Sequence, residues 1–253
     1  MTGDPSAPAV LSPALSAALS VADAQPPPAR ASGTLVGVGM GPGDPDLVTV
    51  RAADLLAEAD VVFVPVADPG GTGPTEQIAL HYAEAWRVER LVIAPHGDER
   101  AWDAVAAAVA SWFGEHPGGL AAFATVGDPC VYSAFTYLAD AVRAVAGGVD
   151  VRIVPGITAM QDLAARAGTP LVQGREALQL FPVTAGAQRF REACERGDAV
   201  VAHDLGGMPP ETLAVLRETG RFDDAVYDAG GPDPSTLLVP PARAGRGGPR
   251  RGR

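Results

Sequence analysis

The sequence contains no lysine, since all 19 of its basic residues are arginine. A Schiff-base lysine, a lysine general base and the phosphate-binding lysine of a Walker loop are therefore excluded. Cysteine is scarce as well, because Cys130 and Cys194 are the two that occur, far apart and in no CxxC pair. A disulfide framework is not indicated, and a reducing cytoplasm is the expected location.

Signals for metal, membrane and nucleic acid are also lacking. The four histidines are scattered without the spacing of metal ligands, so we expect no metal site. No apolar run is long enough to span a bilayer. The formal net charge of -11 argues against general affinity for nucleic acid or anionic membranes. Neither a nucleic acid nor a membrane is therefore an expected partner.

Both ends of the chain are predicted to be disordered. Residues 1–31 are rich in Ala and Pro, but no basic segment precedes their apolar part. They indicate a disordered leader rather than a signal peptide, or translation from a later start codon. Residues 240–253 include the basic, Gly-rich run RAGRGGPRRGR. This composition is typical of a disordered tail, for which RNA contact is a weaker alternative.

Between these ends, short apolar strands alternate with helical patterns. The stretch TLVGVGM predicts a strand, LVTVRAADLLAEA a helix and DVVFVPVA the next strand. A later helix, ERAWDAVAAAVASWFGEH, carries its apolar and aromatic residues on one face, which indicates core packing rather than a cofactor site. The alternation predicts an α/β fold with a mostly parallel sheet and helices on both faces.

The alternation resets near GTPLVQGREA, which predicts two α/β domains with a cofactor cleft between them. We place an N-terminal domain at residues 32–170 and a smaller C-terminal domain at residues 171–239. The second domain contains the predicted strands LQLFPV, DAVVAHDL and DAVYDAG, with only STLLV before the tail. The second domain is therefore expected to be short.

Three loops that leave predicted strands combine glycine with proline. They are GVGMGPGDP, TVGDPCVYS and VPGITA, named here the first, second and third loop. Glycine lets a backbone approach a ligand closely, and proline fixes a turn while removing an N–H donor. Because ligands of open α/β sheets bind outside the carboxyl ends of the strands, these loops form the predicted binding site.

The first loop does not fit a dinucleotide. The dinucleotide-binding fingerprint G-x-G-x-x-G/A needs two residues before its last glycine and an acidic residue at the end of the second strand. Here Pro42 alone separates Gly41 from Gly43, and Pro42 lacks a donor for phosphate. Asp44 adds negative charge at that point, and Asp60 begins the second strand instead of ending it. A nicotinamide oxidoreductase is therefore disfavoured.

The three loops in this order resemble the tetrapyrrole (corrin/porphyrin) methyltransferases, over about residues 33–232. The similarity rests on VGVGMGPGDPDLVTVRAADLLAEADVV, GDPCVYS and VPGITA. It implies a homodimer of two-domain chains, with the cofactor S-adenosyl-L-methionine folded in the cleft. The stretch DVVFVPVA and the pair Tyr132-Ser133 are similar to precorrin-2 C20-methyltransferases. The resemblance thus implies methylation of precorrin-2 or cobalt-precorrin-2 at C20, in cobalamin synthesis.

The resemblance also carries cofactor-binding positions over to this sequence. Contacts with S-adenosyl-L-methionine are expected from all three loops and from the second domain. The implied residues are Gly41, Pro42, Gly43, Val126, Gly127, Asp128, Val131, Thr158, Ala159, His203 and Gly230. Asp128 is expected to help either directly through its carboxylate or by capping the helix that follows, and the cap is the favoured role.

Two side chains are the candidates for contact with the substrate or for proton transfer. Asp44 follows the first loop, and a turn or N-cap role is its alternative. Tyr132 ends the second loop, with a core ring whose hydroxyl bonds to backbone as its alternative. Because the substrate carries many carboxylates, arginines are expected at the rim of the cleft, with Arg51, Arg152 and Arg175 as candidates.

Two alternatives stay open. The chain can instead act on uroporphyrinogen or a later precorrin, which other enzymes of the same family methylate. It can also be a degenerate member that binds cofactor without turnover. The short second domain favours that alternative, as does VVAHDL, which stands where the family usually has a Met-Lys or Met-Gly pair after its strand.

Overall fold

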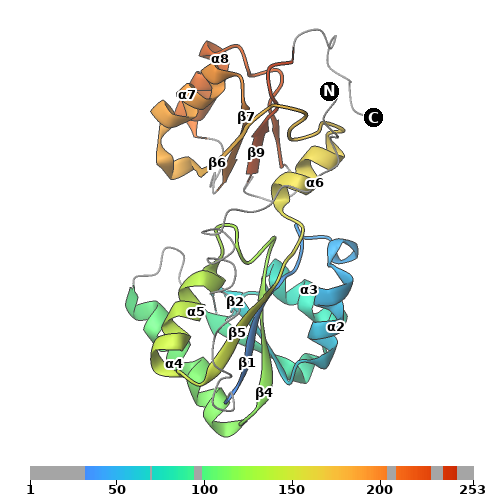
Figure 1. Cartoon of the computed structure of the whole chain (residues 1–253), viewed down its shortest axis with the longest axis vertical. Coiled ribbons are helices and arrows are strands. Elements are labelled where there is room, and N and C mark those ends of the chain that lie inside the picture. The colour runs from blue at the N-terminus through green and yellow to red at the C-terminus, as the bar shows by residue number, and fades with distance from the viewer. Residues whose placement is uncertain (1–31, 69, 94–98, 204–208, 229–235, 244–253) are drawn as a thin grey trace, which may run out of the picture.

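The computed structural model describes residues 32–68, 70–93, 99–203, 209–228 and 236–243 (Figure 1). The predicted leader and residues 244–253 of the predicted tail lie outside these ranges. Two α/β units follow one another along the chain, each built on its own sheet. The predicted fold class is confirmed.

The sheet of the first unit has five parallel strands in the order β3-β2-β4-β1-β5. This order differs from the 3-2-1-4-5 order of dinucleotide-binding folds, in agreement with the spacing of the first loop. The strands are β1 (Gly33–Gly39), β2 (Val61–Val66), β3 (Val88–Val92), β4 (Gly119–Thr125) and β5 (Val149–Val154).

Helices cover both faces of the first sheet. Successive strand residues point to opposite sides, and apolar residues on both sides pack against helices. Leu35 of β1 packs with α4 (Glu99–Glu115) and α5 (Ala134–Val145), whereas Val36 packs with α2 (Val50–Glu58) and α3 (Pro74–Tyr82). Val105, Val109 and Phe113 of α4 are buried, so the predicted core face is confirmed. Two short 3-10 helices, η1 (Pro45–Leu47) and η2 (Ala85–Arg87), lie in the connections.

The second sheet has four strands in the order β6-β7-β9-β8. Strand β6 (Leu178–Pro182) is parallel to β7 (Ala199–His203), while β9 (Thr236–Val239) is antiparallel to β7 and to β8 (Val226–Tyr227). The predicted strand STLLV therefore becomes β9, which lies inside the sheet rather than at its edge. A third 3-10 helix, η3 (Val183–Ala185), follows β6.

Helices also cover both faces of the second sheet. On one face, α7 (Ala187–Arg196) and α8 (Pro210–Glu218) pack on β7 and β9. On the other face, Leu163 of α6 (Ala159–Arg166) packs against Val201 and Leu238. The sequence prediction assigned α6 to the first domain, with a boundary at residue 170. The packing of α6 favours a boundary in the third loop instead. Within the described ranges, no helix is long and apolar enough to cross a membrane.

Candidate functional site

The three loops leave the neighbouring strands β4, β1 and β5 and meet at one edge of the first sheet. Gly39, Gly127 and Gly156, one from each loop, are in backbone contact. A Cβ on Gly156 would lie 2.2 Å from the Gly127 carbonyl oxygen and 2.8 Å from the Gly39 Cα. Only glycine fits at such a distance, so the missing side chains let the three backbones meet.

Backbone hydrogen bonds join the first loop to the second. The Gly127 N–H donates to the Gly41 carbonyl at 2.7 Å, and the Met40 N–H donates to the Thr125 carbonyl at 2.8 Å. Gly41 and Gly127 have φ values of 73° and 72°, in the left-handed region that favours glycine. Gly41 and Gly127, which are both predicted to bind the cofactor, thus join the first loop to the second.

Asp128 joins the second loop to the third. Its side chain is buried, and its two carboxylate oxygens accept from the Cys130 N–H at 2.7 Å and from the Gly156 N–H at 2.9 Å. Ser133 caps α5 instead, because its Oγ accepts from the Phe135 N–H at 3.1 Å. The prediction that Asp128 caps this helix is therefore wrong, since both of its oxygens are engaged within the loops.

The end of the first loop leaves its backbone open. Gly43 has φ 136°, and a Cβ built on Gly43 or on Gly127 would meet no atom within 4 Å. Pro42 beside them is half-buried. A ligand can therefore lie against exposed backbone at Gly43, whereas Gly127 is buried and its N–H is already bonded to the Gly41 carbonyl.

Asp44 caps the short helix η1. Its Oδ1 accepts from the Asp46 N–H at 3.0 Å, and its side chain is exposed. The Tyr82 hydroxyl donates to the Pro45 carbonyl at 2.6 Å and so holds η1 against α3. The turn role given as the alternative for Asp44 is therefore present, on a carboxylate that remains accessible.

The third loop ends in a capping box. The Thr158 Oγ1 accepts from the Gln161 N–H, and the Gln161 Oε1 accepts from the Thr158 N–H at 2.9 Å. Ala159, the other residue predicted here, is the first residue of α6. The predicted pair therefore lies where the chain passes into the helix that packs on the second sheet.

The second loop reaches toward the second domain. Val126 is 40% exposed, Val131 is half-buried, and Tyr132 is 55% exposed. The alternative of a core ring for Tyr132 is therefore wrong, although its hydroxyl does donate to a backbone oxygen, the Leu180 carbonyl in β6, at 3.5 Å. Its ring lies 5.7 Å from that of His203, measured between centroids.

His203 is the last residue of β7, and its Nδ1 lies 3.1 Å from the Thr236 Oγ1. The structure thus brings Tyr132 and His203 together from the two domains, a pairing that the sequence reasoning missed. No signal in the sequence points to it, because the two residues belong to different sheets. Gly230, the remaining predicted position, lies outside the described residues.

The described residues of the site include no strong nucleophile. Burial, followed by the neighbouring Asp128 carboxylate, raises the pKa of the Cys130 thiol. That thiol therefore stays protonated near neutral pH, where it is a poor nucleophile. In the described part of the chain, no three His, Cys, Asp or Glu side chains gather as metal ligands.

The three arginines considered for the rim are all exposed. Arg152 pairs with Asp150 at 2.7 Å on β5, which leaves it less available to a substrate carboxylate. Arg51 lies in the first turn of α2, the helix that follows η1, and Arg175 lies in the segment before β6. Among the residues that the structure describes, neither Arg51 nor Arg175 forms an ion pair, so both stay candidates.

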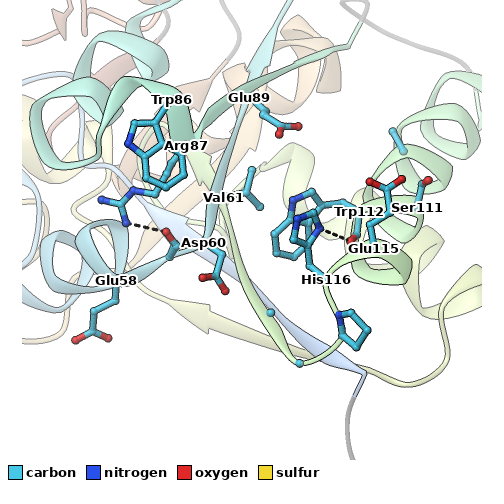
Figure 2. Close-up of a pocket in the computed structure, with 15 residues that line it drawn as sticks. Glu58, Asp60, Val61, Trp86, Arg87, Glu89, Ser111, Trp112, Glu115 and His116 are labelled. Carbon is cyan, nitrogen blue, oxygen red and sulfur yellow. Dashed lines mark hydrogen bonds between the residues drawn. The ribbon is translucent and has the colours of Figure 1, made fainter.

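A large hollow of about 1020 Å³ lies at the opposite edge of the first sheet (Figure 2). It is lined by Val61 and Gly119, which begin β2 and β4. Trp86 and Trp112 lie on its two sides in Figure 2. Because ligands of parallel sheets bind at the carboxyl ends of the strands, this hollow is not the candidate site.

Comparison with known proteins agrees with this geometry. Residues 34–236 match the family described as Tetrapyrrole (Corrin/Porphyrin) Methylases. A precorrin-2 C(20)-methyltransferase of Sinorhizobium sp is 32% identical over 214 residues, which cover 77% of this chain and 82% of the relative. A cobalt-precorrin-2 C(20)-methyltransferase of Salmonella typhimurium is 29% identical over 200 residues, with the same two coverages.

A solved structure agrees with the fold. The crystal structure of the methyltransferase CobJ superposes with a TM-score of 0.62 at 23% identity, and the match covers 86% of this chain and 98% of that one. At this identity the likeness supports the fold alone. The sequence match carries the assignment, so the chain belongs to the tetrapyrrole methylase family, which uses S-adenosyl-L-methionine as its methyl donor.

Proposed function

We propose that this methyltransferase methylates C20 of precorrin-2 or cobalt-precorrin-2 in cobalamin biosynthesis. The observation that carries the proposal is the junction of Gly39, Gly127 and Gly156, which brings three loops together at the carboxyl ends of the strands, where ligands of open α/β sheets bind. Ring position C20 is supported by two relatives that carry it in their names, at 32% and 29% identity. The pair Tyr132-Ser133 at the end of the second loop supports the same choice.

The residues at the junction fit S-adenosyl-L-methionine. Exposed backbone at Gly43 can take polar groups of the cofactor, and Pro42, Val126 and Val131 offer apolar surface beside it. Thr158 and Ala159 lie where the third loop passes into α6, and His203 ends β7 in contact with the Tyr132 ring, so we propose that these three residues also contact the cofactor. Gly41 and Asp128 hold the loops together, and Gly230 is proposed from the family resemblance alone.

When bound, the cofactor supplies a methyl group on a sulfonium, which is a good leaving group. The chain's own part is to hold the substrate carbon in line with that methyl and to exclude water. This task needs no protein nucleophile, in agreement with the lack of lysine and with the protonated Cys130 thiol. Arg51 and Arg175 are proposed to meet substrate carboxylates at the rim.

We propose Asp44 as the group that accepts a proton from the substrate. It is an accessible carboxylate at the end of the first loop, and one of its oxygens already caps η1. Asp44→Asn keeps an N-cap side chain but cannot take a proton. We expect turnover to fall by about 10²–10⁴-fold, the usual contribution of a general base, while cofactor affinity is unchanged. Full turnover of this variant would rule out the role.

The proposed oligomer is a homodimer, and the proposed location is the cytoplasm. The homodimer follows from the family resemblance, and the cytoplasmic location follows from the scarcity of cysteine. Light scattering of the purified protein during gel filtration measures the mass of the particle. A mass of two chains would support the dimer, and a mass of one chain would contradict it.

The test of the reaction is a single turnover with methyl-labelled S-adenosyl-L-methionine and each of the two substrates. Mass spectrometry and NMR of the product give the number and position of the labelled methyl groups. One labelled methyl at C20 is the expected result. A label at another ring position would make the chain a different ring methylase, and cofactor binding without transfer would favour the non-catalytic alternative.

A further inference from the structure

Tyr132 has an unusual backbone. Its φ is 47°, and it is the one residue other than glycine with a positive φ among those that the structure describes. The left-handed region is unfavourable for a bulky L-residue, and such a conformation persists only where its surroundings enforce it.

The segment around Tyr132 is held on both sides. Before it, the Asp128 carboxylate is bonded to the Gly156 N–H at 2.9 Å, which ties the segment to the third loop. After it, the Ser133 Oγ lies 3.0 Å from the Thr125 Oγ1 while capping α5. The chain between these two anchors is short, and the left-handed turn at Tyr132 directs its side chain out of the first domain.

The side chain of Tyr132 reaches the second domain. Its hydroxyl donates to the Leu180 carbonyl of β6 at 3.5 Å, and its ring lies 5.7 Å from the His203 ring with 58° between the planes. His203 is itself held by Thr236 of β9 at 3.1 Å. Because 55% of Tyr132 is exposed, the burial of its side chain does not offset the free-energy cost of its left-handed backbone. The left-handed backbone of Tyr132 instead places its ring in contact with His203 of the second domain.

We propose that Tyr132 is a positioning residue that fixes the spacing of the two domains over the cofactor site through the His203 ring. The ring contact carries the coupling, because a hydrogen bond of 3.5 Å is at the outer limit of useful length. This inference rests on the proposed cofactor site between the three loops and His203. It gives Tyr132 a role in shaping the cleft, in place of proton transfer.

A double-mutant cycle on the dissociation constant for S-adenosylhomocysteine tests the coupling. The variants are Tyr132→Ala, His203→Ala and the double substitution, measured by calorimetry. We expect Tyr132→Ala to bind about tenfold more weakly and His203→Ala at least about tenfold more weakly, because His203 is also a proposed cofactor contact. The double variant should bind no more weakly than about the worse single one, because both substitutions break the same ring contact. Losses that multiply to about a hundredfold would overturn the proposal.

Two further variants keep the test independent of misfolding and of the hydroxyl. Tyr132→Gly removes the ring and accepts a positive φ, so it should fold at least as well as Tyr132→Ala yet bind as weakly. Tyr132→Phe keeps the ring, and its affinity should stay within about twofold of the parent protein. If Tyr132→Phe binds as weakly as Tyr132→Ala, or if Tyr132→Gly binds like the parent, the ring contact is not the coupling element.

Small-angle scattering of the cofactor-free protein supplies a readout that does not depend on the proposed function. The radius of gyration should rise in Tyr132→Ala and Tyr132→Gly and stay unchanged in Tyr132→Phe. If the parent protein fails to bind S-adenosylhomocysteine, the proposed function fails while scattering still decides the coupling. If the parent binds but the radius is the same in all variants, the positioning role alone is overturned.

Discussion

At Asp128 one buried carboxylate accepts a backbone N–H from each of two loops, Cys130 in its own and Gly156 in the third. Asp128→Ala leaves both donors without their acceptor. We expect the free energy of unfolding to fall by about 1.5–3 kcal/mol, the range for hydrogen bonds to a charged group, and affinity for S-adenosylhomocysteine to fall with it. Urea unfolding and calorimetry measure the two effects.

Asp140→Ala is the matched control for that change. Asp140 is exposed and pairs with Arg143 on the surface of α5 at 2.9 Å, an arrangement that contributes little. Its removal should change the free energy of unfolding by less than about 0.5 kcal/mol and leave affinity unchanged. Equal losses in both variants would mean that Asp128 does not join the loops in the way described.

A substitution at Gly156 tests whether close backbone packing joins the three loops. In Gly156→Ala the added Cβ would lie 2.2 Å from the Gly127 carbonyl, and two backbones cannot both move away cheaply. We expect a loss of at least about 2 kcal/mol in the free energy of unfolding, measured by urea titration. At Gly147 the nearest atom to an added Cβ is 3.9 Å away, so Gly147→Ala should be tolerated. Tolerance of both substitutions would contradict the junction.

At the scale of elements, α6 joins the cofactor loops to the second sheet, and its capping box lies at that joint. Thr158→Ala removes the cap and should lower the free energy of unfolding by about 1 kcal/mol, with weaker binding of S-adenosylhomocysteine in calorimetry. Thr49→Ala removes the comparable cap of α2, outside the three loops. Thr49→Ala should lower the free energy of unfolding by a similar amount without weakening the binding of S-adenosylhomocysteine. An equal loss of affinity in both variants would contradict a specific link between α6 and the cofactor loops.

Elements whose pattern is local could be predicted from the sequence. The buried face of α4 and the strands named from the sequence, among them β1, β2 and β7, follow from hydrophobic periodicity. The assignment of α6 to a sheet could not, because its short apolar face fits either core. The cap of α5 was misassigned to Asp128 because hydrogen bonds to a distant loop leave no trace in local sequence.

At the scale of the whole molecule, the site depends on contacts between segments that are far apart in the chain. The Gly-Pro loops could be placed at strand ends from the sequence, and the structure confirms that they meet. The strand order that makes β4, β1 and β5 neighbours could not be predicted, because only long-range packing decides it. The contact of Tyr132 with His203 has the same origin, since it exists only once both sheets have formed.

The account's central claim is that this junction holds S-adenosyl-L-methionine between the two domains. Calorimetric titration of the purified protein with S-adenosylhomocysteine, alongside NADH, tests it most directly. We predict a dissociation constant on the order of micromolar for S-adenosylhomocysteine and no heat of binding for NADH. Pro42 lacks an N–H donor for a pyrophosphate, and Asp44 would repel its negative charge. No binding of S-adenosylhomocysteine, or binding of NADH alone, would contradict the account.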